Sequence, residues 1–465
     1  MIFDKIYRSL PIWLQNFAVS IYGYGWNKRR FGGVFTMQKN LFQEREFFTG
    51  TEWIDYQRKT LRSLLKHSLE EVEFYKNKYA SLNVSPIEWD LFELEDLKKL
   101  PFLEKDDFRK YGETTLLAKH FDKDGTFLSS SGSSGTPTRI YFSKKFHQTW
   151  QAALEVRMRQ WAGVTFETPR GMIGGRRIVP DANAKGPYYR YNWFEKQTYF
   201  SAYHISKANV KDYLEGMIRN NVQYMTGYAF ANYELALLIE SSGLVAPKMK
   251  AVITSSEKLT IEMRDVLSRV YQCKVYDSYS GNEACGLITE SPENKLLFSP
   301  DTGIIEILDD LGNEVQPGEE GELVFTGLLN FDQPLIRYRI GDRAIKAKNQ
   351  LTLSARHMQV VDEIAGRIED KIVTRDGRVM VRFHSLFYDL PNLQKGQVIQ
   401  QDYESYIINL QIEEEYDKKS SEEIITKRLN SQIDNDLHIE FNYFDKIPVG
   451  PNAKFRAVIS KMNKK

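Results

Sequence analysis

The stretch FLSSSGSSGTPTRIYFS, residues 127–143, has the residue types of a loop that binds phosphate. Five serines, two glycines, a threonine and a proline lie within its first eleven residues. Small hydroxyl side chains and inward-turned backbone N–H groups can wrap a polyphosphate. No lysine directly follows Gly135, so the common nucleotide-binding pattern of glycine, four residues, glycine and lysine is absent.

A flexible linker is the alternative interpretation of this stretch, because tracts of serine and glycine commonly connect folded units. The flanking residues favour a loop. Phe127 and Leu128 precede the tract, and Ile140, Tyr141 and Phe142 follow it. Short apolar runs on both sides predict a strand–loop–strand element. Composition by itself leaves phosphate binding and a linker about equally well supported.

The segment SSSGSSGTPT is also similar to the phosphate-binding loop of the adenylate-forming enzymes, and in particular of the phenylacetate–CoA ligase family. The resemblance implies a large α/β domain that binds ATP and a carboxylic acid, followed by a small mobile α+β domain. It implies that the ATP phosphates are bound by Ser130, Ser131, Gly132, Ser133, Ser134, Gly135 and Thr136.

Two later segments resemble the parts of this family that hold the nucleoside. PLIRYRIGDRA (334–344) is similar to a segment whose aspartate, here Asp342, accepts hydrogen bonds from both ribose hydroxyls, a role that suits one carboxylate. VITSSEKLT (252–260) resembles a strand that ends in a turn of small residues facing the adenine. The resemblance assigns that role to Ser255, Ser256 and Glu257.

The segment DSYSGNEACGLI (277–288) resembles the part of the family that contacts the base, the α-phosphate and the metal. By this resemblance Tyr279 stacks near the adenine, Asn282 contacts the α-phosphate and Glu283 holds Mg²⁺. The family usually has serine or threonine at the middle position. Asparagine keeps a hydrogen-bonding group there but differs from the pattern.

The C-terminal part carries two further resemblances. GRIEDKIV is similar to the hinge segment of the family, in which Arg367 would contact the nucleotide and Glu369 and Asp370 would form the pivot. DKIPVGPNAKFRAVIS is similar to the segment with the catalytic lysine, here Lys454. Ala453 replaces the usual glycine, and the spacing from the proline is one residue longer.

Each of these segments has an ordinary alternative, since a late lysine or a glutamate beside a turn commonly faces solvent. Their occurrence in one order from residue 129 to 456 favours the resemblance. The runs GGRRIVP and YMTGYAFANYELALLI resemble members of the family from capsule and surface-polysaccharide clusters. The stretch TESPENKLLFS lacks the cysteine and histidine with which many relatives hold zinc, so no zinc is expected.

The carboxylic acid would be bound by the middle of the chain, with Tyr228, Phe230 and His204 as the candidates. Aromatic side chains suit an aryl or acyl group, and equally suit ordinary core packing. A histidine after an aromatic strand is more often a hydrogen-bonded structural residue than a ligand contact.

The family resemblance implies an AMP-forming ligase that uses ATP and Mg²⁺ to adenylate a carboxylic acid and passes the acyl group to a thiol such as CoA. One alternative is transfer to an amine, such as an amino sugar of a surface polysaccharide, which gives an amide. Another is an inactive scaffold of a glycan-assembly complex. The departures from the family pattern at Asn282 and around Lys454 are the reason to retain this alternative.

The spacing of apolar residues along the chain predicts the helices and strands that position these candidate site residues. Residues 1–120 are mostly helical, and VQYMTGY, MKAVITSS, IEMRDVLSRVY and CKVYDSYSG then alternate between strands and a helix. This rhythm predicts a parallel sheet covered by helices. The β-rich GIIEILDDLGNEVQPGEEGELVFTGL follows. We therefore expect an α/β fold with a large domain at 1–365 and a small α+β lid at 366–465.

Composition excludes several classes of protein. The 63 Lys and Arg nearly balance the 62 Asp and Glu, so no nucleic acid is expected as a partner. Two cysteines suit a reducing cytoplasm. No signal peptide is evident at the N-terminus.

The uncharged aromatic run at 12–26, followed by KRR, is too short to span a bilayer but suits contact with the inner face of the membrane. Packing onto the protein's own body is the commoner alternative.

Overall fold

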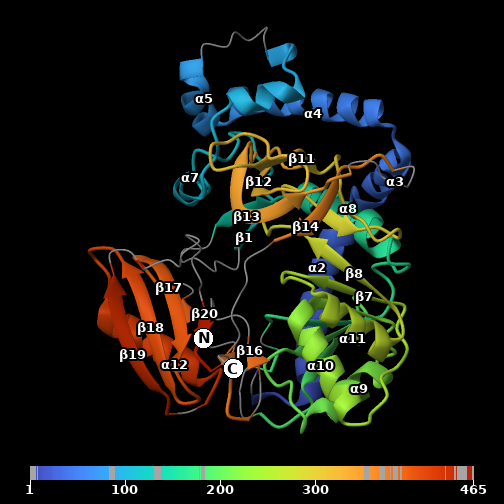
Figure 1. Cartoon of the computed structure of the whole chain (residues 1–465), viewed down its shortest axis with the longest axis vertical. Coiled ribbons are helices and arrows are strands. Elements are labelled where there is room, and N and C mark those ends of the chain that lie inside the picture. Colours follow the sequence, from blue (N-terminus) through green and yellow to red (C-terminus); the bar gives the residue numbers. More distant parts are fainter. Residues whose placement is uncertain are drawn as a thin grey trace.

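The computed structural model of the chain describes most of its 465 residues. The described residues are 7, 9–82, 89–129, 138–176, 178–179, 184–349, 356–365, 372–376, 379–380, 386–387, 390–434, 436–444, 447 and 458–462. Their arrangement is shown in Figure 1. Among them, no helix is both long enough and apolar enough to cross a membrane.

The first part of the described chain is helical. The long helix α4 begins at a capping box, in which Thr49 and Glu52 satisfy each other's backbone N–H groups. Leu61, Leu64 and Leu65 are fully buried on its inner face. The elements are α2 Ile12–Phe31, α3 Phe35–Glu44, η1 Arg45–Phe47, α4 Gly50–Glu71, α5 Glu73–Tyr79, η2 Ala80–Leu82, η3 Leu94–Lys99 and α7 Lys105–Tyr111.

A twelve-stranded sheet forms the centre of the molecule, in the order β11-β12-β13-β14-β10-β9-β8-β7-β6-β3-β5-β4. Its parallel half comprises β3, β5, β6, β7 and β8, with β4 antiparallel at the edge. Apolar strand residues buried against helices explain this layering. The elements are β3 Arg170–Gly174, β4 Tyr189–Asn192, β5 Gln197–Ser201, α9 Val210–Arg219, β6 Tyr224–Tyr228, α10 Ala229–Ser241, β7 Ala251–Ser255, α11 Ile261–Tyr271 and β8 Lys274–Tyr279.

The other half of the sheet is antiparallel, as the β-rich sequence predicted. It begins where β9 pairs antiparallel with β8. In Figure 1 it lies below α4, in yellow and orange. Its strands are β9 Ile288–Glu290, β10 Leu296–Phe298, β11 Gly303–Leu308, β12 Glu320–Gly327, β13 Tyr338–Lys346 and β14 Val360–Ile364. A separate antiparallel pair, β1 Thr126–Ser129 and β2 Arg139–Phe142, flanks the serine-rich stretch and leads into α8 Lys144–Leu154.

The C-terminal part has its own sheet and core, seen at lower left in Figure 1. Its sheet has the order β19-β18-β17-β20, with α12 packed through Ile425 and Leu429. The elements are β15 Ile372–Val373, β16 Val379–Met380, β17 Leu393–Gln400, β18 Ser405–Ile412, α12 Lys418–Asn430, β19 His438–Phe444 and β20 Val458–Ser460. The predicted fold class, α/β with a β-rich part and a small α+β part, is confirmed. The expected boundary at 365/366 adjoins residues 366–371, which lie outside the described residues.

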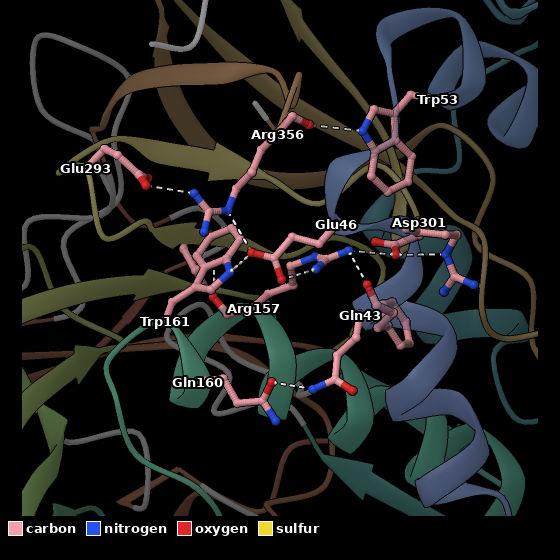
Figure 2. A network of polar contacts seen from close by, with 12 residues as sticks. Gln43, Glu46, Trp53, Arg157, Gln160, Trp161, Glu293, Asp301 and Arg356 are labelled. Carbon is pink, nitrogen blue, oxygen red and sulfur yellow. Dashed lines mark hydrogen bonds and ion pairs between the residues drawn. The ribbon is translucent and has the colours of Figure 1, made fainter. Parts of the chain in front are cut away.

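A buried ion cluster ties the N-terminal helices to the sheet (Figure 2). Arg157, in the π-helix Glu155–Gln160, is fully buried and pairs with Asp301 at 3.2 Å and Glu46 at 3.5 Å. Arg45 reaches Asp301 at 3.1 Å, and Arg356 reaches Glu46 at 2.8 Å. Each buried charge therefore has an opposite charge beside it, as burial requires. The cluster holds η1 and the π-helix in one position.

Candidate active site

The parallel strands bring the predicted ligand residues to one edge of the sheet. Tyr228, Ser255 and Ser278 are direct neighbours across β6, β7 and β8. Because these strands run in the same direction, the residues that follow them all emerge at the carboxyl edge. His204 follows β5 at the same edge, and Asn282 and Glu283 follow β8. Ligands of α/β sheets bind at this edge.

Two unusual backbone positions shape the turns at this edge. Gly227 has φ of +119°, and a Cβ atom there would lie 1.9 Å from the carbonyl oxygen of Ile173. Only glycine fits such a conformation and such a close approach. Ser256 has φ of 72°, in the left-handed region, directly after β7. The turn of small residues that the sequence predicted after β7 is therefore a sharp one.

Glu257 connects the predicted adenine segment to the predicted acid pocket. Its Oε2 accepts a hydrogen bond of 2.9 Å from the backbone N–H of Phe230. Phe230 is the second residue of α10, and the first-turn N–H groups of a helix have no partner within the helix. The carboxylate thus stabilises the start of α10, in addition to any contact with a nucleotide.

Glu283 is buried and held by two hydroxyl groups. Thr138 Oγ1 and Tyr338 OH each donate to Glu283 Oε1 at 3.1 Å. Burial, with the Glu283 carboxylate beside it, raises the pKa of Tyr338 well above its usual value, so the phenol remains a donor. Gly281 lies close by, where a Cβ would come within 2.8 Å of Glu283 Oε2. The two hydroxyl donors therefore orient the carboxylate, and the absence of a side chain at Gly281 leaves room for it.

Thr138 is the first described residue after the serine-rich stretch. Its bond to Glu283 places Thr138 itself beside the predicted metal ligand. The sequence reasoning did not assign a role to Thr138 or Tyr338, although both lie in segments that it singled out. The signal was their adjacency to the motif residues, and only the folded structure shows which atoms they reach.

Tyr279 and Asp342 meet although they lie on distant strands. The Tyr279 hydroxyl donates to Asp342 Oδ2 at 2.8 Å, and the Tyr279 ring stacks on Phe325 with 6.4 Å between centroids. Burial and the neighbouring Asp342 raise the pKa of Tyr279 well above its usual value. The structure thus places the predicted base-stacking ring and the predicted ribose carboxylate side by side.

The candidate acid-pocket residues lie near the ends of β3, β5 and β6. A Cβ on Gly175 would come within 2.5 Å of the Tyr228 hydroxyl, and the Tyr203 hydroxyl donates to Gly175 O at 3.2 Å. His204 is buried, with its Nδ1 2.7 Å from Ser201 Oγ and its ring stacked on Tyr188 at 4.8 Å. These contacts hold the imidazole in one orientation. Sequence reasoning missed Tyr203 and Gly175, whose relation to Tyr228 depends on strand register.

Several predicted site residues lie outside the described residues: Ser130, Ser131, Gly132, Ser133, Ser134, Gly135, Thr136, Arg367, Glu369, Asp370 and Lys454. In the described part, no group of three or more His, Cys, Asp and Glu side chains could hold a metal ion. A single carboxylate such as Glu283 nevertheless fits Mg²⁺, which is commonly bound by one or two carboxylates, substrate phosphates and water.

Comparisons with known proteins bear on this arrangement. The family model for the CapK C-terminal domain matches residues 372–461. The chain is 24% identical to protein CapK of Staphylococcus aureus over 463 residues, which are 98% of this chain and 99% of that protein. It is 26% identical to the phenylacetate–coenzyme A ligase of Pseudomonas putida over 344 residues, or 69% of this chain and 72% of the relative.

Among solved structures, 2-hydroxyisobutyryl-CoA ligase in complex with 2-HIB-AMP and CoA matches with a TM-score of 0.58 and 16% identity, covering 90% of this chain and 91% of that one. The chain has the adenylate-forming enzyme fold. Its resemblance to the phenylacetate–CoA ligase family, and to a capsule-related branch, is confirmed.

Proposed function

We propose that the protein is an AMP-forming ligase that activates a carboxylic acid with ATP. The observations that support the proposal are two hydrogen bonds: Tyr279, at the carboxyl end of β8, donates to Asp342, and Tyr338 donates to Glu283, which follows β8. These carboxylates come from segments about sixty residues apart, Gly281–Glu283 and Gly341–Asp342. The ligase names of the relatives and of the matching solved structure support the same reaction class.

The reaction must bring a carboxylate to the α-phosphorus of ATP. A carboxylate oxygen forms the new bond to phosphorus, the bond to the bridging oxygen breaks, and pyrophosphate leaves with that electron pair. When bound, Mg²⁺ would offset the negative charge of the phosphates. Glu283 would hold the ion, and Asp342 would fix the ribose. The hydroxyls and N–H groups of residues 130–136, the amide of Asn282 and the Lys454 ammonium would bind the phosphate oxygens.

We further propose that Tyr279 and the turn Ser255–Glu257 flank the adenine, that Arg367 contacts the nucleotide, and that Tyr228, Phe230 and His204 line the acid site. The domain at 366–465 would turn about Glu369 and Asp370, placing Lys454 for adenylation and removing it for transfer. The protein would act in the cytoplasm.

The acceptor in the second half-reaction is proposed to be the thiol of CoA, which would attack the acyl carbon and release AMP. An amine acceptor, such as an amino sugar of a surface polysaccharide, is the second candidate. It rests on the resemblance to the capsule-related branch, since the similarity to CapK spans 98% of the chain and the similarity to the phenylacetate–CoA ligase spans 69%.

Acid-dependent exchange of labelled pyrophosphate into ATP tests adenylation, with a broad panel of carboxylic acids and hydroxylamine to trap the acyl-adenylate. The expected result is exchange and hydroxamate formation with some acids. ATP binding without exchange for any acid would instead support the inactive scaffold. Once an acid is found, release of AMP on addition of CoA or of amino sugars identifies the acceptor.

The lysine is tested separately. We expect Lys454→Ala to abolish pyrophosphate exchange and to spare acyl transfer from a supplied acyl-adenylate. Lys461→Ala, in the same C-terminal segment, is the matched control and should retain both half-reactions. If Lys454→Ala removes both half-reactions equally, the lysine does not act in adenylation alone.

A further inference from the structure

Helix α2 carries apolar side chains on more than one side: Val19 and Phe31 pack against core clusters, whereas a stripe of large apolar side chains is exposed. Its buried residues are Gln15, Ser20 and Gly23. Large apolar side chains at positions 13, 17, 21 and 24 instead face outward, and Trp13 is 67% exposed. Surface helices of soluble proteins normally show the opposite arrangement, with the apolar stripe against the core.

The edge of the central sheet explains why the polar side faces inward. Strand β4 lies at the end of the sheet, so its outward N–H groups have no neighbouring strand. Asn16 Oδ1 accepts from the Tyr191 N–H at 3.0 Å, and Ser20 Oγ accepts from the Trp193 N–H at 3.1 Å. Asn16 and Ser20 of α2 thereby accept the hydrogen bonds that a further strand at this edge would otherwise accept.

A turn next to the helix extends the exposed apolar surface. Trp193 and Phe194, between β4 and β5, are each about half exposed. Phe17 contacts Trp193 with 6.4 Å between ring centroids, and Tyr24 contacts Phe194 at 4.8 Å. We call this surface the aromatic face, and it consists of Trp13, Phe17, Ile21, Tyr24, Trp193 and Phe194. Two separate segments thus build one continuous surface.

The charges around the aromatic face are positive. Residues 9–43 contain no Asp or Glu but contain Lys28, Arg29, Arg30 and Lys39. Lys28 lies 4.5 Å from the Tyr24 ring centroid. The one acid in the neighbouring turn, Glu195, is buried and paired with Arg30 at 2.9 Å, whereas Lys196 is exposed. Within residues 9–43 and 193–196, the surface therefore combines aromatic side chains with exposed ammonium groups and has no exposed carboxylate.

We propose that the aromatic face docks the protein onto the surface of a bilayer that contains anionic phospholipid. Tryptophan and tyrosine favour the level of the headgroups, and lysines beside them attract anionic lipid. An interfacial helix of this kind lies in the membrane plane without crossing it. A second copy of the chain is the less favoured occupant, because both of the paired faces would carry the positive charges of Lys28 and Lys196.

Flotation with lipid vesicles tests the proposal. The full chain is mixed with vesicles of phosphatidylcholine, with or without phosphatidylglycerol. We expect it to float with the anionic vesicles and to be released by high salt. Trp13→Glu/Phe17→Glu should weaken partitioning by roughly tenfold for each side chain lost. Leu91→Glu/Leu311→Glu, two exposed leucines outside the aromatic face, should leave partitioning unchanged.

A second measurement does not depend on a charged substitution. Brominated lipids should quench tryptophan fluorescence of the unaltered protein, and Trp13→Phe/Trp193→Phe should remove most of that quenching while keeping the fold. Near-ultraviolet circular dichroism checks folding of each variant. Equal binding to neutral and anionic vesicles, no binding to either, or a vesicle-free dimer that Trp13→Glu/Phe17→Glu dissociates would each overturn the proposal.

Discussion

The hydroxyl of Tyr279 donates a hydrogen bond of 2.8 Å to Asp342 Oδ2, and the two residues belong to strands β8 and β13. Three strands, β9, β10 and β14, separate β8 from β13 in the sheet. The contact therefore requires the antiparallel half of the sheet to coil back over the end of the parallel half. It joins the residue proposed to flank the adenine to the residue proposed to bind the ribose.

Asp342→Asn is predicted to raise the KM for ATP by about tenfold to a hundredfold, because a charge-assisted hydrogen bond contributes about 1.5–3 kcal/mol. Pyrophosphate exchange at varied ATP concentration measures the change. Asp310→Asn, at a highly exposed carboxylate, is the control and should leave KM unaltered. An unchanged KM in Asp342→Asn would remove this residue from the proposed nucleotide site.

Glu283→Gln is predicted to lower the exchange rate by roughly 10²–10³-fold and to raise the Mg²⁺ concentration needed for half-maximal rate. Glutamine has nearly the same volume but lacks the charge that would hold the ion. Tyr338→Phe removes one of the donors to Glu283 and should have a smaller effect in the same direction. Glu320→Gln, at the exposed start of β12, serves as control. A Mg²⁺ dependence identical to that of the unaltered protein would contradict the assignment.

Gly227→Ala is predicted to destabilise the protein by about 1–3 kcal/mol, because a Cβ at φ of +119° would collide with the Ile173 carbonyl oxygen. Urea unfolding measures the change. Gly25→Ala is the matched control, since a Cβ there meets no atom within 4 Å in the middle of α2. It should be neutral or stabilise by up to about 1 kcal/mol. If both variants are equally stable, the backbone at the end of β6 adjusts to accommodate a Cβ atom at position 227.

Arg157→Met is predicted to destabilise the protein by about 3–5 kcal/mol, because Asp301 and Glu46 would lose a buried partner (Figure 2). Arg219→Met, at an exposed arginine in α9, should change the free energy of unfolding by less than about 0.5 kcal/mol. Both values come from urea unfolding at neutral pH. If the two variants are equally stable, the cluster of Figure 2 contributes nothing measurable.

Asp277 gives a prediction for pH. Burial, together with the nearby Glu290 carboxylate, raises the pKa of Asp277 to about 6. The folded state therefore holds this proton at a higher pH than the unfolded state, whose pKa is near 3.8. The contribution of Asp277 to stability falls as the pH rises from about 4 to about 6, and then stays constant.

Asp277→Asn should remove that dependence. Relative to the unaltered protein, its stability should rise between pH 4 and pH 7 by on the order of 2 kcal/mol. Urea unfolding across this range, with Asp310→Asn as the control for other titrating groups, measures the difference. A difference that does not vary with pH would show that Asp277 titrates normally in the folded state.

The local patterns were sufficient to predict much of this molecule. The alternation of VQYMTGY, MKAVITSS and IEMRDVLSRVY indicated β6, β7 and α11, since side-chain periodicity is set by the backbone of each element. The carboxyl-edge position of Tyr228 and Ser255 follows once the strands are parallel. The order of the motifs indicated the adenylate-forming fold and which residues to search for at the site.

Contacts between segments far apart in the sequence were decided only by the tertiary structure. No local pattern shows that Thr138 and Tyr338 bond to Glu283, or that Tyr279 bonds to Asp342, because each contact depends on how the sheet coils. The apolar run of α2 suggested ordinary core packing. The helix instead meets the free edge of the sheet at β4, where Asn16 and Ser20 accept hydrogen bonds from the N–H groups of Tyr191 and Trp193, and a stripe of its large apolar side chains stays exposed.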